Sequence, residues 1–444
     1  MTDELNTILQ RGAKDNFVLF CYFYDYDFFK SRPFLKEIAQ AFQDIADGKM
    51  ETLSVSLPPR AGKSYITTLF CAWIIGKYPT ESVMRNTCSA RLAYKLSRDT
   101  REIFTGEKFQ SVFPDVKLSQ DNKAMDGWST NQSRNAAYFG QGVGGTIIGF
   151  GASKLAITDD LFRSMEDAMS ETIREKTHSW KHGTHDSRLE KGCAQIDIGT
   201  RWVRDDVIGV NSSEGRYNKE IVVPALIDGV SFCESVQSTE KFLEMKSRMP
   251  DEIWQAEYMQ QPVDVEGRIF ENLHTFTDVQ WVKDNSEGCL AYIDVADEGG
   301  DFLAMAVGHL IGTDVYITDV VFTKGNTDIT IPLCAEILNK EQPRYTRVET
   351  NGMGALFVKM LRKETNVSII GINNSTNKAT RIFMNSGFVN NFMKFQDTDK
   401  GAHFQFIQAL GKYSHEGKNK NDDAPDCITG LAMFFQTTFR KLYL

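Results

Sequence analysis

Short apolar runs alternate with longer amphipathic segments in the first half of the chain. The runs predict buried strands at residues 53–57, 83–88, 154–158, 194–198 and 220–223. A helix-like spacing of apolar residues precedes the first strand and ends at Gly48, and further helical stretches separate the strands. Alternating strands and helices indicate an α/β fold with a mostly parallel sheet and helices on both faces.

The pattern restarts after a predicted linker at residues 260–267. Three successive strands are predicted at 290–295, 303–310 and 314–322. The elements expected next are a helix at 329–339, a strand at 347–349, a helix at 355–363, a strand at 367–372 and a helix at 425–435. Three antiparallel strands followed by alternating helices and strands are the order of an RNase H-like domain.

The length of 444 residues exceeds what one hydrophobic core supports. We therefore expect two domains, at 1–262 and 263–444, with residues from about 205 to 262 forming a lid or linker subdomain. The N-terminus has no signal-peptide core, and no apolar run is long enough for a membrane span. The eight cysteines include no CxxC pair, which argues against a zinc site.

The net charge of −9 argues against a general nucleic-acid binder, but the charge is unevenly distributed. Residues 340–420, which we call the basic stretch, contain 13 Lys and Arg against 6 Asp and Glu. A local basic surface can hold phosphates on an acidic protein. The alternative is a solvated lysine-rich surface.

The segment PPRAGKS at residues 58–64 joins a predicted strand to a predicted helix. In this position the loop amides and the helix N-terminus face an anion. Gly62 would allow close backbone approach, Lys63 would neutralise the β- and γ-phosphates, and the Ser64 hydroxyl would ligate Mg²⁺. The residues expected to bind ATP here are Arg60, Ala61, Gly62, Lys63, Ser64 and, from a second strand, Asp159. Leu57 replaces the first glycine of the full pattern, so an ordinary strand–helix turn is the alternative.

A phosphate-loop ATPase requires a second strand that ends in a carboxylate for Mg²⁺, and the predicted strand at 154–158 is followed by Asp159 and Asp160. Asp159 would hold the magnesium ion, and Asp160 would orient or deprotonate the attacking water. Acidic strand ends are also common without such a role. The glycine-rich segment 140–146 upstream indicates a backbone that bends or moves, or a plain surface hairpin.

After the strand at 194–198, Thr200 and Arg201 are candidates for coupling hydrolysis to movement. Thr200 at the strand tip would sense the γ-phosphate. Arg201 is a candidate for the same coupling and, alternatively, a structural ion-pair partner.

In the second half, Asp294 lies within an apolar strand, Glu349 ends another strand, and Asp426 lies near the start of the last helix. A buried carboxylate needs a cation or hydrogen-bond donors. Three such groups could hold two Mg²⁺ or Mn²⁺ ions about 3.5–4 Å apart for phosphodiester cleavage. Asp423 is a further candidate ligand, although helix capping alone would explain the cluster of Asp422, Asp423 and Asp426. Asp297 and Asp301 are turn residues that could assist.

Seven segments in this order resemble the large terminase subunits of tailed bacteriophages, from about Phe34 onwards. They are PPRAGKS at 58–64, GGT at 144–146 leading to Asp159-Asp160, IGTRW at 198–202, WQAEYMQQP at 254–262, Ile293-Asp294 with GGD at 299–301, ETNG at 349–352, and DDAPD at 422–426.

The resemblance implies a DNA-packaging ATPase followed by an RNase H-like nuclease. It implies ATP with Mg²⁺ at the first site and Mg²⁺ or Mn²⁺ at the second, with Asp160, Asp294, Glu349 and Asp426 catalytic. The implied partners are double-stranded DNA, the portal protein of the procapsid, a small terminase subunit, and further copies of the chain in a ring, commonly of five. It also implies the host cytoplasm, with transient docking at the procapsid.

The sequence departs from the family at three places. Asp160 stands where Glu is usual, and Asp423 stands where some relatives have His. Phe150 replaces an Arg that is a candidate finger for the neighbouring subunit's ATP, so Arg134 or Arg163 would have to serve. Two other functions stay open: an ATP-dependent helicase–nuclease, and a nucleotide-dependent DNA-binding switch with degenerate sites.

Overall fold

The computed structural model describes residues 3–124, 126–147, 149–262, 268–271, 273–295, 302–351, 354–374, 377–414, 419 and 422–439. The chain forms two compact units, Met1–Phe242 with Ile253–Asp264, and Leu243–Glu252 with Val265–Leu444. The helices α11 (Thr239–Arg248) and α12 (Asp251–Ile253) contribute residues to both units. The predicted linker residues 263–267, and Asp297, Asp301 and Gly352, lie outside the described residues.

The first unit is built on an eight-stranded sheet of order β3-β4-β5-β2-β6-β7-β1-β8. Its strands are β1 (Thr52–Ser56), β2 (Val83–Thr87), β3 (Leu118–Lys123), β4 (Gly127–Thr130), β5 (Tyr138–Phe139), β6 (Leu155–Asp159), β7 (Ala194–Gly199) and β8 (Lys219–Val222). From β5 to β8 all neighbours pair in parallel, and β3, β4 and β5 pair antiparallel. The predicted mostly parallel sheet is confirmed. The antiparallel edge was not predicted.

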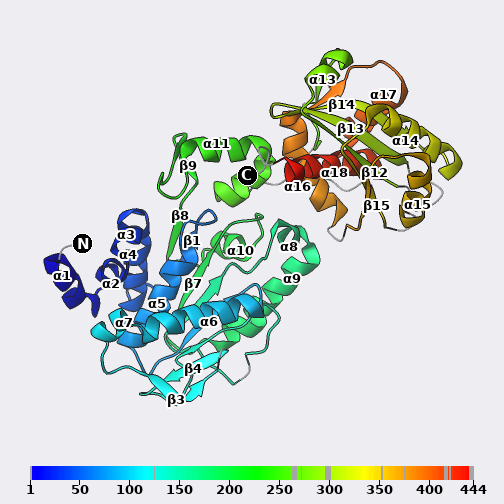
Figure 1. The fold of residues 1–444 in the computed structure, drawn as a ribbon. Helices are drawn as coiled ribbons and strands as arrows, with labels where there is room; N and C mark the ends of the chain where they lie inside the picture. The colour runs from blue at the N-terminus through cyan, green and yellow to red at the C-terminus, as the bar shows by residue number, and fades with distance from the viewer. Residues whose placement is uncertain are drawn as a thin grey trace. The chain divides into compact units, whose positions relative to one another are not determined.

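Helices lie around this sheet (Figure 1). Aromatic side chains pack around α5 (Lys63–Lys77) in the core of the unit. Phe70 and Trp73 of α5 pack against Phe17 of α2, and Phe70 also stacks on Phe42 of α4. The helices are α1 (Asp3–Ala13), α2 (Phe17–Tyr24), α3 (Tyr26–Lys30), α4 (Leu35–Ala46), α5 (Lys63–Lys77), α6 (Ala90–Thr105), α7 (Glu107–Val112), α8 (Met165–Met169), α9 (Glu171–Trp180) and α10 (Val207–Ser213). Shorter elements are η1 (Lys181–His185), η2 (Asp186–Arg188), η3 (Trp254–Tyr258) and the hairpin of β9 (Leu226–Ile227) with β10 (Val230–Ser231).

The second unit is built on a seven-stranded sheet of order β11-β17-β14-β13-β12-β15-β16. Its strands are β11 (His274–Phe276), β12 (Gly288–Asp294), β13 (Leu303–Ile311), β14 (Asp314–Thr323), β15 (Tyr345–Glu349), β16 (Ile369–Ile372) and β17 (Met393–Gln396). The successive strands β12, β13 and β14 are antiparallel, while β15 and β16 add to β12 in parallel. The predicted RNase H-like order is confirmed.

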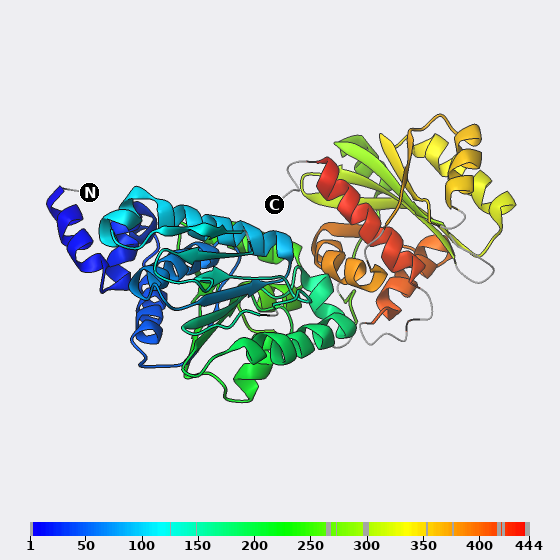
Figure 2. The ribbon, with the colours of Figure 1, turned by 90° about the horizontal axis from the view of Figure 1, so that it is seen from below.

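The last helix, α18, packs against β12 and β13 (Figure 2). The helices of this unit are α13 (Val279–Asn285), α14 (Thr327–Glu341), α15 (Gly354–Glu364), α16 (Lys378–Phe392), α17 (Gly401–Lys412) and α18 (Asp423–Thr438). Of these, α13, α16 and α17, together with the strands β11 and β17, were not predicted. Among the described helices, none is long and apolar enough to cross a membrane.

Candidate nucleotide and metal sites

The phosphate-loop segment lies between β1 and α5, as the sequence predicts. Gly62 occupies the N-cap of α5 with φ of 103°, a conformation that L side chains avoid. Lys63 is the first helical residue and is buried, whereas Arg60 and Ser64 are exposed. The loop therefore presents a cation and a hydroxyl at a helix N-terminus, where backbone N–H groups favour an anion.

Lys63, Thr200 and Asp160 meet at the carboxyl ends of three adjacent parallel strands, β1, β7 and β6. The Lys63 ammonium donates to Thr200 Oγ1 at 2.5 Å and lies 4.0 Å from Asp160 Oδ2. The Thr200 amide donates to Asp160 Oδ1 at 2.8 Å. The protein around the half-buried Asp160 raises the pKa of its carboxyl, and Lys63 opposes that rise. The structure thus places Thr200 between the phosphate loop and the acidic strand end.

The neighbouring carboxylate, Asp159, is buried against Arg85 of β2. Arg85 Nε donates to Asp159 Oδ2 at 3.0 Å, and the second guanidinium nitrogen donates to the same oxygen. The same guanidinium donates to Thr68 Oγ1 at 2.8 Å and to the Ser64 carbonyl at 3.2 Å. Asp159 is therefore linked to α5 through an arginine that the sequence reasoning did not single out.

Arg201 has a structural partner in Asp206, which is the alternative that the sequence left open. Its Nε lies 3.0 and 2.9 Å from the two carboxylate oxygens of Asp206. The Arg201 amide donates to Gln260 Oε1 at 3.0 Å, and Gln260 Nε2 donates to the Glu257 carbonyl. The segment after β7 is thus tied to the one-turn π-helix η3.

Three residues of this region have left-handed backbone conformations although none is glycine. They are Arg60, Asp160 and Gln260, with φ of 63°, 48° and 60°. Such conformations cost on the order of 1 kcal/mol or more each and persist where the surroundings enforce them.

Close backbone approach accounts for the glycines before the acidic strand. A Cβ on Gly140 would lie 2.0 Å from the Arg85 carbonyl oxygen, and one on Gly142 would lie 2.4 Å from the Ala90 nitrogen. Arg134 and Arg163, the two alternatives for a finger, are both exposed. Phe150 stacks on Phe139, with ring centroids 5.0 Å apart.

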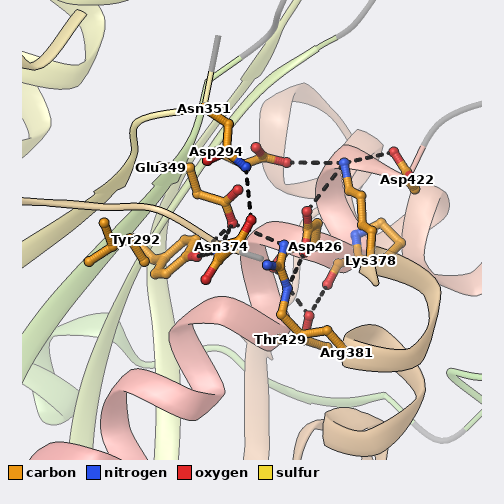
Figure 3. A network of polar contacts seen from close by, with 12 residues as sticks. Tyr292, Asp294, Glu349, Asn351, Asn374, Lys378, Arg381, Asp422, Asp426 and Thr429 are labelled. Carbon is orange, nitrogen blue, oxygen red and sulfur yellow. Dashed lines mark hydrogen bonds and ion pairs between the residues drawn. The ribbon is translucent and has the colours of Figure 1, made fainter. Parts of the chain in front are cut away.

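In the second unit, Asp294, Glu349 and Asp426 converge, and all three are buried (Figure 3). One carboxylate oxygen from each lies within 4.8 Å of the other two. Asp294 ends β12 and Glu349 ends β15, and these strands pair in parallel with Ile293 opposite Val348. Parallel pairing therefore brings the two strand ends together, and the first turn of α18 adds Asp426.

Two cations of α16 point into this triad of carboxylates (Figure 3). Lys378 Nζ lies 3.6 Å from Asp294 Oδ2, 3.2 Å from Asp426 Oδ2 and 2.9 Å from Asp422 Oδ1. Arg381 donates to Asp426 Oδ1 from Nε at 3.0 Å and to Glu349 Oε1 at 3.1 Å.

Polar neighbours fix the orientation of Glu349. Tyr292 Oη and Asn374 Nδ2 each donate to Glu349 Oε1 at 2.7 Å. Burial raises the pKa of the Asp294 carboxyl well above its ordinary value, with Lys378 opposing and Asp426 and Glu349 adding to the rise. Burial also raises the pKa of Asp426.

The triad fits a divalent cation. Asp294 Oδ2 is buried without a hydrogen-bond donor, and the Lys378 ammonium sits among the same oxygens. Clustered carboxylate oxygens are the ligands that Mg²⁺ and Mn²⁺ prefer. Asp294, Glu349 and Asp426 would hold such an ion.

Asp422 and Asp423 behave differently from the triad. Asp422 is the N-cap of α18, but its side chain makes no capping hydrogen bond and pairs with Lys378 instead. Asp423 Oδ2 accepts from the Phe302 amide at 3.2 Å. Among the described residues, the metal-capable group comprises the triad without Asp423.

Three charged residues of these sites were not predicted from the sequence: Arg85, Lys378 and Arg381. Arg85 carried a signal, because a charged residue inside the apolar run 83–88 needs a counter-charge. Lys378 and Arg381 lie in a helix that was not predicted. Glu257, whose carbonyl accepts from Gln260, lies in the WQAEYMQQP segment, for which no chemical role was predicted.

Comparison with known proteins bears on both units. Residues 293–387 match the family model described as the terminase of bacteriophage T7, ribonuclease H-like domain. The large terminase of a thermophilic bacteriophage superimposes with a TM-score of 0.51 at 10% identity, covering 88% of this chain and 98% of that chain. The complex of that terminase with ATP-γ-S gives a TM-score of 0.51 at 10% identity, covering 88% and 97%. The HK97 large terminase gives a TM-score of 0.35 at 13% identity, covering 90% and 94%. No curated protein matches the chain in sequence. The chain has the fold of that thermophilic-phage large terminase, and residues 293–387 match the terminase RNase H-like family model, in agreement with the resemblance found in the sequence.

Proposed function

We propose that this protein is a phage DNA-packaging motor with an attached endonuclease. Residues 1–262 hydrolyse ATP to drive double-stranded DNA into a procapsid, and residues 263–444 cut the concatemer when packaging starts and ends. The working form is a homo-oligomeric ring, of five copies by analogy with the family, on the portal, with a small terminase subunit selecting the DNA.

One observation carries the proposal: three buried carboxylates share a centre in the unit that has the terminase RNase H-like fold. Divalent ions bound there would activate water and stabilise the leaving oxygen of a phosphodiester. Asp294, Glu349 and Asp426 supply the ligand oxygens. Tyr292 and Asn374 orient Glu349, and Arg381 donates to both Asp426 and Glu349.

The nuclease is tested by Asp294→Ala in the full chain. Plasmid cleavage in Mn²⁺ should fall by at least about 100-fold, because the ligand set loses one of its three carboxylates. ATP hydrolysis should stay within about twofold. The matched control is Asp284→Ala, an exposed aspartate of α13 in the same unit. If the Asp294→Ala protein still cuts, the nuclease centre lies elsewhere.

The ATPase is tested by Lys63→Ala. Phosphate release from Mg-ATP should fall on the order of 100-fold or more, because the cation facing the transferred phosphoryl group is lost. Lys36→Ala removes an exposed lysine of α4 in the same unit and should leave turnover unchanged. Equal and negligible turnover in wild type and Lys63→Ala would favour a nucleotide-dependent switch.

The helicase–nuclease alternative requires a second helicase-type ATPase domain. Within the described residues, the second unit instead has a sheet of RNase H-like order. A packaging assay with procapsids, ATP and linear DNA separates the two functions. DNA protected from added nuclease inside procapsids supports the motor, and strand separation without protection supports the helicase.

A further inference from the structure

Glu257 lies in η3, a one-turn π-helix of the first unit. Such turns are rare and recur at functional sites, because the wider turn re-aims the side chains within it. Here the Met259 amide donates to the Trp254 carbonyl at 2.9 Å, and Trp254 stacks on Tyr258 with ring centroids 4.9 Å apart. The Ala225 amide donates to the Tyr258 carbonyl at 2.8 Å, which anchors the turn to the rest of the unit.

A side-chain bridge ties this turn to the phosphate loop. Gln260 is buried, accepts from the Arg201 amide and donates to the Glu257 carbonyl. Arg201 directly follows Thr200, which contacts both Lys63 and Asp160. Gln260 therefore connects the backbone of Glu257 to Arg201, and the neighbouring Thr200 connects the phosphate loop to Asp160.

The charges around Glu257 belong to the same site. After burial, which raises the pKa of its carboxyl, the strongest influences on that pKa are Lys63, which lowers it, and Asp160, which raises it. Burial raises the pKa of the neighbouring Tyr258 hydroxyl, and Arg60 of the phosphate loop opposes that rise. Among the described residues, no hydrogen bond engages the Glu257 carboxylate, whereas Asp160 has Oδ1 bonded to Thr200 and Oδ2 facing Lys63.

We propose that the Glu257 carboxylate accepts a proton from the attacking water when ATP is hydrolysed at this phosphate loop, an inference that rests on the proposed ATPase function. The water oxygen forms a bond to the γ-phosphorus. The bond from the γ-phosphorus to the β,γ-bridging oxygen breaks, and its electron pair leaves with ADP. The proton passes from water to Glu257 and then to solvent. Asp160, held by Thr200, keeps the water oriented, and Glu257 supplies the reach that the shorter Asp160 lacks.

The ionisation of Glu257 suits this role. Burial, the largest influence, raises the pKa of its carboxyl to about 7, while Lys63 lowers it and Asp160 raises it further. A general base works best when its pKa lies near the operating pH, because it is then ionised and still takes up a proton readily.

The test compares Glu257→Gln with the full wild-type chain in Mg-ATP. The amide keeps the shape but cannot take the proton, so kcat should fall about 100-fold or more. The affinity for ATP-γ-S, measured by calorimetry, should change less than about threefold, since general-base loss acts on the chemical step. Glu240→Gln makes the same change at an exposed position of α11 in the first unit and should match wild type.

The outcomes separate this inference from the proposed function. A Glu257→Gln protein with near wild-type kcat overturns the inference, provided Lys63→Ala is inactive. If Lys63→Ala hydrolyses ATP as fast as the wild-type protein, the proposed ATPase site itself is overturned. If Glu257→Gln no longer binds ATP-γ-S, Glu257→Asp decides: retained binding with reduced kcat supports the inference, and unchanged kcat contradicts it. Loss of binding in both variants would assign Glu257 to holding the nucleotide and would also overturn the inference.

Discussion

Asp159 and Asp160 are adjacent carboxylates in opposite surroundings. Asp159 is buried and bonded to Arg85, while Asp160 is half-buried and faces Lys63. A buried ion pair fixes geometry, since removing one partner leaves an uncompensated charge that destabilises a protein by about 3–5 kcal/mol. The sequence assigns magnesium to Asp159 and water to Asp160. The contacts make Asp160 the more accessible of the two to a bound nucleotide.

His185 gives the first unit a pH dependence of its own. Burial lowers the pKa of this imidazole to about 3, with the nearby Lys181 adding to the effect, and Asn86 Nδ2 lies 2.8 Å from its Nδ1. The unfolded chain takes up the proton near pH 6.5, whereas the folded chain stays neutral until far lower pH. The free energy of unfolding is therefore highest above pH 6.5, where both states hold a neutral His185, and falls progressively as the pH drops from 6.5 toward 3.

Between pH 7.5 and 5.5, His185 should lower the free energy of unfolding by about 1 kcal/mol, a loss that His185→Gln removes. Urea unfolding followed by tryptophan fluorescence reports the first unit, which contains every tryptophan except Trp281. His182→Gln, at a half-exposed imidazole of the same turn, is the control. Identical pH dependence in wild type and His185→Gln would contradict a buried neutral imidazole.

At the scale of elements, the packing of α18 on β12 sets the position of Glu349. A Cβ on Gly430 would lie 2.3 Å from Tyr292 Cζ, and Tyr292 donates to Glu349. Gly430→Ala should therefore displace Tyr292 and destabilise the second unit by about 1–3 kcal/mol. Mn²⁺-dependent cleavage should fall even where the protein remains folded.

Gly411→Ala in α17 is the matched control for this prediction. A Cβ there meets nothing within 4 Å, so the same substitution should be neutral or stabilise by up to about 1 kcal/mol. Thermal unfolding and cleavage are measured for both variants. Equal behaviour of the two would show that the fit of Tyr292 beneath α18 is not tight.

The elements foreseen from the sequence are those with a strong local pattern. Apolar runs such as 53–57 and 290–295 form buried strands because a central strand of a sheet is shielded from water on both faces. By contrast, β3 has the polar sequence LSQDNK at the sheet edge, and α16 combines apolar, Asn and Lys residues without a clear face. Tertiary contacts decide such segments, so they were missed.

The residues of the candidate sites also divide into those that a local pattern predicts and those that depend on tertiary structure. Asp294, Glu349 and Asp426 were foreseen because carboxylates on two apolar strands and at the start of the last helix match the metal-binding set of an RNase H-like nuclease. The structure brings them together through the parallel pairing of β12 with β15 and the packing of α18. Their catalytic role stays a prediction. The partners Lys378 and Arg381 depend on the placement of an unforeseen helix, which residue spacing does not encode.

For the molecule as a whole, much of the basic stretch is occupied by internal contacts. Lys340 pairs with Asp319 and Glu341, Lys394 pairs with Asp314, and Arg381 points into the triad. Lys412 instead lines a cavity of about 900 Å³ together with Lys324, Phe302 and Phe404. The local excess of positive charge therefore overstates what is available to DNA.

If this cavity contacts DNA phosphates, Lys412→Ala should reduce the slope of log affinity against log salt by about 1. Fluorescence anisotropy with a labelled duplex measures that slope between about 50 and 200 mM salt. Lys340→Ala removes a lysine of the same stretch that is already ion-paired, and its slope should equal that of wild type. A flat salt response in wild type would exclude phosphate contacts as the main source of affinity.

The left-handed backbone at Arg60, Asp160 and Gln260 has a consequence for protein engineering. Glycine at Arg60, whose side chain is exposed, would relieve backbone strain and raise the melting temperature, whereas glycine at Asp160 or Gln260 would also remove the hydrogen bonds from the Thr200 and Arg201 amides. A screen that selects only for thermostability would thus enrich variants that lose the Arg60 side chain, including variants in which the proposed ATPase activity is slower. Directed evolution of this chain should therefore score turnover and heat resistance together.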